Sequence, residues 1–115
     1  MARKDFDLIT EWVEPDSRIL DLGCGDGSLL RLLNKERNIS GYGVDTSIDK
    51  TIKSLDNKIN IINADINDHM DYFKDKSFDY VILAQSLQVV DNPVSLIKEM
   101  LRIGNDCLLY TSPSP

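Results

Sequence analysis

Two kinds of segment alternate along this chain. In one the apolar residues have the spacing of a helix, and in the other they form the short runs typical of buried strands. Short apolar runs bounded by turn-forming residues predict five strands, at residues 19–22, 42–45, 59–63, 78–84 and 107–110. Segments with helical spacing separate them and predict helices at residues 5–13, 28–35, 46–55, 67–73 and 93–103. Strands that alternate with helices favour an α/β fold built on a parallel sheet.

The residues that repeat along one side of each predicted helix are expected to be buried. They include Phe6, Ile9, Trp12 and Val13 in the first helix, Met70 and Phe73 in the fourth, and Val94, Leu96, Ile97, Met100 and Leu101 in the last. The last helix has clear end signals, because Asn92 and Pro93 favour a helix start and Gly104 suits its end.

Right-handed crossovers restrict how such strands can be ordered. We expect a Rossmann-like, doubly wound sheet in the order 3-2-1-4-5, with helices on both faces and a ligand crevice above strands 1 and 4. Residues 1–110 are expected to form one domain that is incomplete at its C-terminus. Residues 111–115 read Thr-Ser-Pro-Ser-Pro, which is unsuited to a parallel strand and predicts a non-native or disordered tail.

Composition narrows the possible functions. The chain has 115 residues and a formal net charge of −6, so the basic footprint of a nucleic-acid-binding protein is absent. Two cysteines do not make a disulfide framework. The N-terminus leads into no apolar signal core, and no apolar run is long enough to span a bilayer. These features favour a cytoplasmic protein that acts on a small molecule or another protein.

The candidate chemistry is concentrated in residues 19–27, Ile-Leu-Asp-Leu-Gly-Cys-Gly-Asp-Gly. Gly23, Gly25 and Gly27 allow a tight turn with positive φ and a close approach to a ligand. The helix that follows offers unpaired N–H groups at its start, which favour an anionic group such as the carboxylate of a methionine moiety. Cys24 lies inside this turn, where we interpret it as a small space-filling residue at the edge of the site.

Asp21 decides between two kinds of nucleoside cofactor. A dinucleotide motif requires a third glycine where this chain has Ser28, although Asp45 stands at the distance expected of a ribose-binding acid in either class. A carboxylate beside a pyrophosphate would be repelled, whereas one beside the α-ammonium of S-adenosylmethionine would be attracted. The residues therefore favour S-adenosylmethionine over NAD.

The other predicted cofactor residues follow strands 2, 3 and 4. Asp45 is expected to accept hydrogen bonds from both ribose hydroxyls, and Asp65 to accept one from the adenine amino group beside Ile66. Helix capping is the alternative role for both acids. Gln85 and Ser86 follow strand 4 beside the methionine end, where they either bind the cofactor or line the substrate side, and a turn that starts the next helix is the alternative. The complete predicted site comprises Asp21, Gly23, Cys24, Gly25, Gly27, Asp45, Thr46, Asp65, Ile66, Gln85 and Ser86.

No catalytic base can be named from the sequence. His69 is the only histidine, and its polar surroundings favour a solvated surface position. No group of residues has a metal-ligand spacing, so no metal site is predicted.

The motifs together resemble the class I S-adenosylmethionine-dependent methyltransferases. The resemblance depends on residues 19–27, on Gly-Tyr-Gly-Val-Asp at 41–45 and on Phe-Asp-Tyr-Val-Ile-Leu at 78–83. Within that group the chain is most similar to the MetW family of methionine biosynthesis, over roughly residues 5–109, with further matches at 84–90 and 96–104. It departs from the family at Thr111–Pro115, where the family continues with a phenylalanine-proline-asparagine stretch.

The resemblance implies a methyltransferase-like fold, a cofactor site at Asp21, Gly23, Gly25, Asp45 and Asp65, and a role in supporting homoserine O-acyltransferase. We therefore expect a binding or regulatory subunit that holds S-adenosylmethionine. An active methyltransferase with an unknown acceptor is the alternative, and an NAD-binding domain is disfavoured by Asp21 and Ser28.

Overall fold

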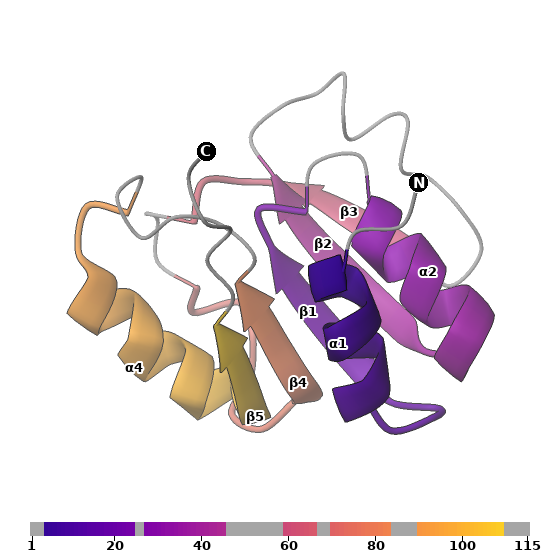
Figure 1. Cartoon of the computed structure of the whole chain (residues 1–115). Coiled ribbons are helices and arrows are strands. Elements are labelled where there is room, and N and C mark those ends of the chain that lie inside the picture. Colours follow the sequence, from indigo (N-terminus) through magenta and orange to yellow (C-terminus); the bar gives the residue numbers. More distant parts are fainter. Residues whose placement is uncertain (1–3, 25–26, 46–58, 67–69, 84–89, 110–115) are drawn as a thin grey trace.

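The computed structural model of the chain describes residues 4–24, 27–45, 59–66, 70–83 and 90–109. Three helices and five strands lie within these residues (Figure 1). In chain order they are α1 (Lys4–Trp12), β1 (Arg18–Leu22), α2 (Ser28–Arg37), β2 (Ser40–Asp45), β3 (Ile59–Asn63), β4 (Phe78–Leu83), α4 (Pro93–Ile103) and β5 (Gly104–Leu109). The predicted helix at 46–55 lies outside the described residues, as do Ala84 and the tail at 111–115.

All five strands belong to one parallel sheet in the order β3-β2-β1-β4-β5, which confirms the predicted Rossmann-like topology. The chain moves outward from β1 to β3 and then returns to place β4 on the other side of β1. The winding therefore reverses between β1 and β4, the position at which open α/β sheets bind ligands.

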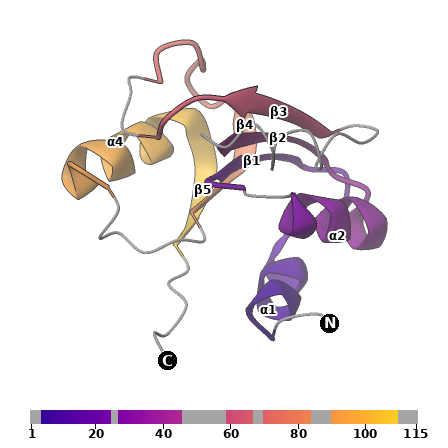
Figure 2. The same ribbon diagram turned by 90° about the horizontal axis from the view of Figure 1, so that it is seen from above.

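Helices cover both faces of the sheet, with α1 and α2 on one face and α4 on the other (Figures 1 and 2). Side chains of β1 alternate between the two cores, because successive residues of a strand point to opposite faces. Ile19 packs in the core beneath α1 and α2, whereas Leu20 and Leu22 pack in the core beneath α4. This alternation assigns Asp21 to the face that carries α1 and α2.

Helix α4 begins and ends where its sequence predicts. Asn92 is the N-cap, and its side-chain oxygen accepts a hydrogen bond of 3.1 Å from the backbone N–H of Ser95. Glycine often ends a helix because it can adopt a left-handed conformation, but Gly104 does not adopt that conformation. Its φ is −111°, and a Cβ there would lie 2.6 Å from Val81 Cγ2, so glycine is needed for close contact with β4.

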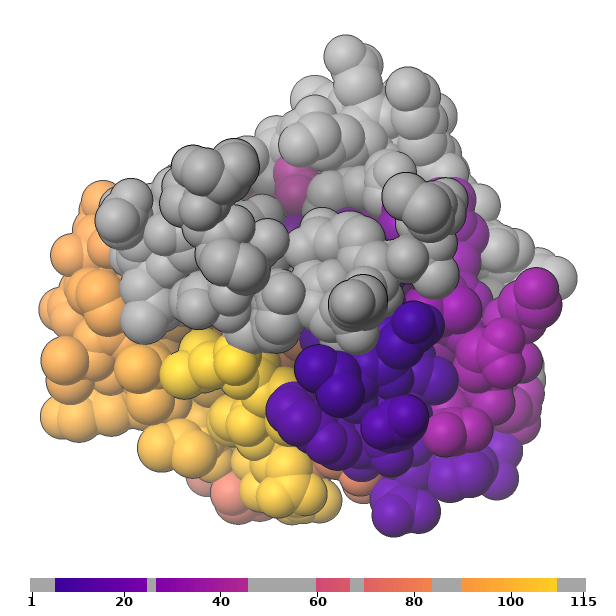
Figure 3. Space-filling view, in the orientation of Figure 1, coloured from indigo at the N-terminus to yellow at the C-terminus, as the bar shows by residue number. Residues whose placement is uncertain are grey.

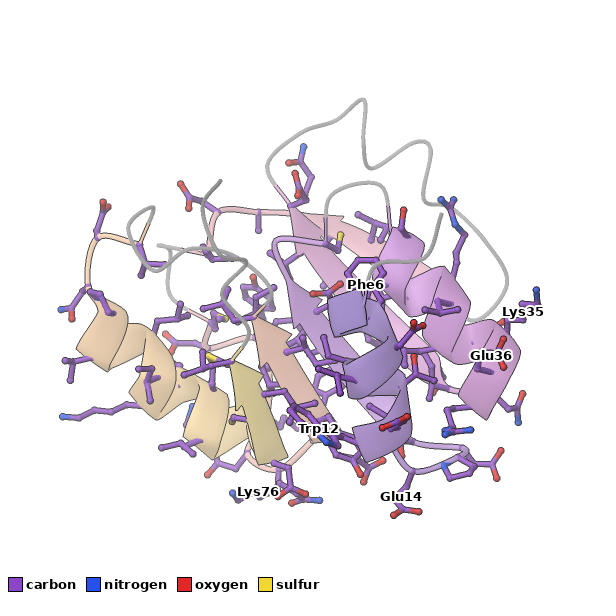
Figure 4. All side chains as sticks on the ribbon, viewed as in Figure 1. Phe6, Trp12, Glu14, Lys35, Glu36 and Lys76 are labelled. Carbon is purple, nitrogen blue, oxygen red and sulfur yellow. The ribbon has the colours of Figure 1, made fainter. Side chains whose placement is uncertain are left out.

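Three residues predicted to be buried are exposed. Val94 and Leu101 of α4 are 64% and 55% exposed, and Trp12 of α1 is 56% exposed. The buried stripe of α4 consists of Leu96, Met100 and Ile103. Val94 and Leu101 lie two helical turns apart on the opposite side of the helix. Trp12 lies beside the stripe formed by Ile9 and Val13, at the end of α1 farther from the strand C-termini than Phe6 (Figure 4).

The predicted helix around Met70 and Phe73 is also wrong, because residues 71–73 form turns. Both side chains are nevertheless buried in the core beneath α4. The N–H of Phe73 donates to the carbonyl of Met70 at 3.1 Å, and the Arg102 guanidinium donates to the carbonyls of both residues. These carbonyl oxygens are therefore paired with a distant side chain rather than within a helix.

The surface of α1 lies between the surfaces of α2 and β5 in the space-filling view (Figure 3). A hydrogen bond connects the two helices, because Arg37 Nε donates to the carbonyl of Thr10 at 3.0 Å. None of the helices in the described part of the chain has the length and apolar character that a membrane crossing requires.

Candidate functional site

The glycine turn after β1 has the predicted backbone geometry. Gly23 has a φ of 73° and Gly27 a φ of 78°, both in the left-handed region that favours glycine. Helix α2 begins directly after Gly27, which caps it without a side-chain hydrogen bond. Gly25 lies outside the described residues.

Backbone hydrogen bonds fix this turn against the end of β2. The N–H groups of Gly23 and Cys24 both donate to the carbonyl of Val44, at 2.7 and 3.1 Å. The N–H of Gly27 donates to the carbonyl of Cys24 at 3.0 Å. Because Asp45 directly follows Val44, the turn and the acid at the end of β2 are held in a fixed relation.

Gly43 makes room for Cys24, a function that the sequence reasoning missed. A Cβ at Gly43 would lie only 2.5 Å from Cys24 Sγ and 2.8 Å from Ile61 Cδ1. Cys24 is buried, in agreement with a space-filling role. The available signal was the pair of alternating glycines at 41 and 43, because glycine within a strand marks a close approach of another group.

Asp21 is the most unusual polar residue of the described structure. It pairs in register with Gly43 of β2 and Ile82 of β4, and only 2% of its surface is exposed. Its Oδ1 atom has no hydrogen-bond partner among the described residues. Burial raises the pKa of this carboxyl to about 8, and the negative charge of Asp45 adds to the rise.

Asp45 and Asp65 lie at the same edge of the sheet as Asp21. Asp45 is the last residue of β2 and is buried. The N–H of Ala64 donates to the carbonyl of Asp45 at 3.1 Å, which fixes the segment that carries the half-buried Asp65. Ile66 is half-buried and packs against the core beneath α4.

The structure therefore places the three predicted acids at or just after the C-terminal ends of the adjacent strands β1, β2 and β3, on the side of the sheet where the glycine turn follows β1. A buried carboxylate without a partner is unfavourable to ionise, and a cation placed against it restores the charged form. This edge is suited to a ligand that carries a positive group. Thr46, Gln85, Ser86 and His69 lie outside the described residues.

Comparison with solved structures identifies the class of fold. A proposed methyltransferase from an antibiotic biosynthesis pathway of Anabaena variabilis ATCC 29413 matches 94% of this chain with a TM-score of 0.80 and 22% identity, over 44% of its own chain. An S-adenosylmethionine-dependent methyltransferase from Geobacter sulfurreducens, solved with S-adenosyl-L-homocysteine, matches 90% with a TM-score of 0.73 and 19% identity, over 45% of its chain.

The [4+2]-cyclase SpnF matches 88% of this chain with a TM-score of 0.77 and 23% identity, over 40% of its own chain. The fold is the Rossmann-like fold of class I methyltransferases. The model of the family described as methionine biosynthesis protein MetW matches residues 3–113, and the chain belongs to that family.

A curated relative agrees with this assignment. The bifunctional methionine biosynthesis protein MetXA/MetW of Rhodopirellula baltica (strain DSM 10527 / NCIMB 13988 / SH1) is 34% identical over 113 residues, which cover 91% of this chain. The chain spans 18% of the length of that relative.

Proposed function

We propose that this chain binds S-adenosylmethionine at the C-terminal edge of its sheet. Asp21 faces the α-ammonium group, Asp45 accepts hydrogen bonds from the ribose hydroxyls, and Asp65 accepts one from the adenine amino group. The observation that carries the proposal is the buried Asp21 carboxyl, whose Oδ1 has no partner among the described residues and lies beside the glycine turn. The structural relative solved with S-adenosyl-L-homocysteine supports the choice of ligand.

The remaining predicted residues complete this proposed site. Gly23, Cys24 and Gly27 shape the turn, and Gly25 belongs to the same turn by sequence. Thr46, Ile66, Gln85 and Ser86 are assigned to the ligand from their positions after strands 2, 3 and 4. The half-buried Ile66 offers its remaining surface to the adenine ring.

NAD fits this edge less well. A dinucleotide places a pyrophosphate at the glycine turn. Here that phosphate pair would stand near the Asp45 carboxylate, which would repel it, and near the buried Asp21, whose charged form a further negative group would make still less favourable. A ligand with an ammonium group avoids this repulsion.

The biological role that we propose is support of homoserine O-acyltransferase in methionine synthesis. The curated relative carries the names MetXA and MetW in one bifunctional protein, which supports a physical link between the two activities. S-adenosylmethionine is made from methionine, so a subunit that holds it can report the end product of the pathway. Catalysis of methyl transfer is the second candidate, favoured by the methyltransferase fold. The same fold also occurs in a [4+2]-cyclase, so the fold does not settle the reaction.

Calorimetric titration of S-adenosylmethionine tests the proposed site. We expect binding to the wild-type chain and a loss of about tenfold or more in Asp45→Ala, because each lost hydrogen bond contributes roughly 0.5–1.5 kcal/mol. Glu36→Gln is the matched control, since it removes one exposed negative charge at the far end of α2 (Figure 4). Tight binding of NAD, or equal affinities in the wild type and Asp45→Ala, would contradict the proposal.

A second experiment tests the role. The chain is mixed with a homoserine O-acyltransferase, and co-purification and the acylation rate are measured with and without S-adenosylmethionine. We expect a complex and a changed rate. Methyl transfer to an acceptor without any complex would favour the second candidate instead.

A further inference from the structure

We propose that a cationic ligand expels a proton from Asp21 when it binds, so that occupation of the site increases with pH. The inference deepens the proposed function and rests on it. Two carboxyl groups lie on one face of the sheet. Val44 packs in the core beneath α4, so the neighbouring Asp45 projects to the other face, where Asp21 also lies.

Within the described part of the chain, the neighbours of Asp21 are apolar or lack a side chain. Its lateral neighbours in the sheet are Gly43, which has no side chain, and Ile82, which is fully buried. Apolar side chains cover this face: Ile9 of α1, Val13 directly after that helix, and Leu29, Leu30 and Leu33 of α2. A carboxyl in such a place favours its protonated form.

Of the titratable groups that the structure describes near this face, none neutralises Asp21. From β2 comes Asp45, which is negative, and from the turn comes the buried thiol of Cys24. The Tyr80 hydroxyl of β4 contacts the Trp12 carbonyl and the Glu14 N–H instead. Arg31 of α2 is half-buried, and among the described residues only Asp45 contributes a charge that shifts the Asp21 pKa.

The empty site should therefore hold a proton at neutral pH, because the pKa of Asp21 is raised to about 8. An ammonium group beside the carboxyl favours the carboxylate, and the proton passes to the solvent. At pH 7 each bound ligand is expected to release close to one proton. Affinity then increases up to about tenfold per pH unit below pH 8 and stops increasing above it, where Asp21 is already ionised and the ligand's own ammonium group begins to lose its proton.

Titration calorimetry in buffers with different ionisation enthalpies measures this proton directly. The probe is S-adenosyl-L-homocysteine, which carries the α-ammonium group. Methylthioadenosine is the matched control ligand, because it shares the nucleoside but lacks the amino-acid end. We expect proton release of close to one per ligand with the first and none with the second.

Two variants sharpen the test. Asp21→Asn should bind S-adenosyl-L-homocysteine more weakly and release no proton. Asp45→Asn should release fewer protons at pH 7, because the removal of its charge lowers the Asp21 pKa. Binding to the wild type without proton release would overturn this inference and leave the proposed function intact. Failure of both ligands to bind the folded wild-type chain would overturn the proposed function, and the inference with it.

Discussion

Two polar residues of this molecule, Arg102 and Asp21, differ in whether the chain itself satisfies them. Each of the three guanidinium nitrogens of Arg102 donates hydrogen bonds, to Glu99, Asp75 and the carbonyls of Met70 and Phe73. Asp21 is more deeply buried, yet its Oδ1 has no partner among the described residues. We interpret the fully hydrogen-bonded Arg102 as a residue that stabilises the fold, and Asp21 as one that is available for a ligand.

The comparison shows that burial alone does not identify a functional group. Buried polar atoms in proteins are nearly always paired, so an exception needs a reason. Arg102 connects α4 to the turn at 70–73. Both lie on the face of the sheet opposite to the one that carries α2, which follows the glycine turn. Asp21 stands beside the glycine turn, at the reversal point of the sheet, which is the position at which open α/β sheets bind ligands.

Substitution of Arg102 by methionine should have the largest effect on stability. It removes the donors for two backbone carbonyls, and we expect the free energy of unfolding to fall by about 2–4 kcal/mol. Chemical denaturation measures the loss. Lys98→Met, on the exposed side of the same helix, is the control and should change stability by less than about 0.5 kcal/mol. If Arg102→Met changed stability as little as the control does, the claim that Arg102 stabilises the fold would be wrong.

Asp21→Asn should change the pH dependence of stability instead. The unfolded chain has the ordinary Asp pKa of 3.8, whereas the folded carboxyl has a pKa of about 8. The folded state therefore holds the proton more tightly, and this residue makes the free energy of unfolding decrease as pH rises from about 4 to about 8. The slope from this group is at most about 1.4 kcal/mol per pH unit.

Denaturation of the wild type and Asp21→Asn across this pH range isolates the contribution, because all other groups are common to both. As pH rises, the free energy of unfolding of the variant should increase relative to that of the wild type. The variant should nevertheless bind the ligand more weakly. A difference that stays constant from pH 4 to 8 would mean that Asp21 ionises normally.

Gly43→Ala should destabilise the junction between the glycine turn and β2. The added methyl would overlap Cys24, and overpacking of this kind typically costs about 1–3 kcal/mol. Cys24→Ala should partly restore stability in the double variant, because it removes the sulfur. Strictly additive free energies of unfolding in the double-mutant cycle would show that the two residues do not compete for space.

Asp75→Ala should have the smallest effect. Its side chain is 77% exposed, and its ion pair with Arg102 at 2.9 Å is open to solvent. Such pairs contribute about 0–1 kcal/mol, and added salt should reduce even this. A loss of stability comparable to that of Arg102→Met would show that the ion pair with Asp75, and not the hydrogen bonds to the carbonyls of Met70 and Phe73, accounts for the contribution of Arg102.

The sequence predicted the parts of the molecule that depend on local pattern. Alternating strands and helices specified the strand order, and the glycines at 23 and 27 adopt the positive φ that their spacing indicated. The sequence also placed Asp21, Asp45 and Asp65 at adjacent strand ends, because parallel strands bring their C-termini to one edge.

Features that depend on distant contacts were not predictable in this way. The turn at 70–73 replaces a helix because Arg102, some 30 residues away in the chain, binds its carbonyls. Strand β5 begins at Gly104 rather than at Cys107, since pairing with β4 extends it to the end of α4. The unsatisfied state of Asp21 is likewise a property of its packed surroundings and has no signature in its neighbours along the chain.

The pKa of Asp21, followed through its carboxyl carbon by NMR with and without S-adenosyl-L-homocysteine, tests the central claim most directly. We predict that the carboxyl titrates near pH 8 in the empty protein and several pH units lower in the complex. Titration near pH 4 in both states would contradict the claim that this carboxyl is protonated in the empty site and is ionised by a cationic ligand.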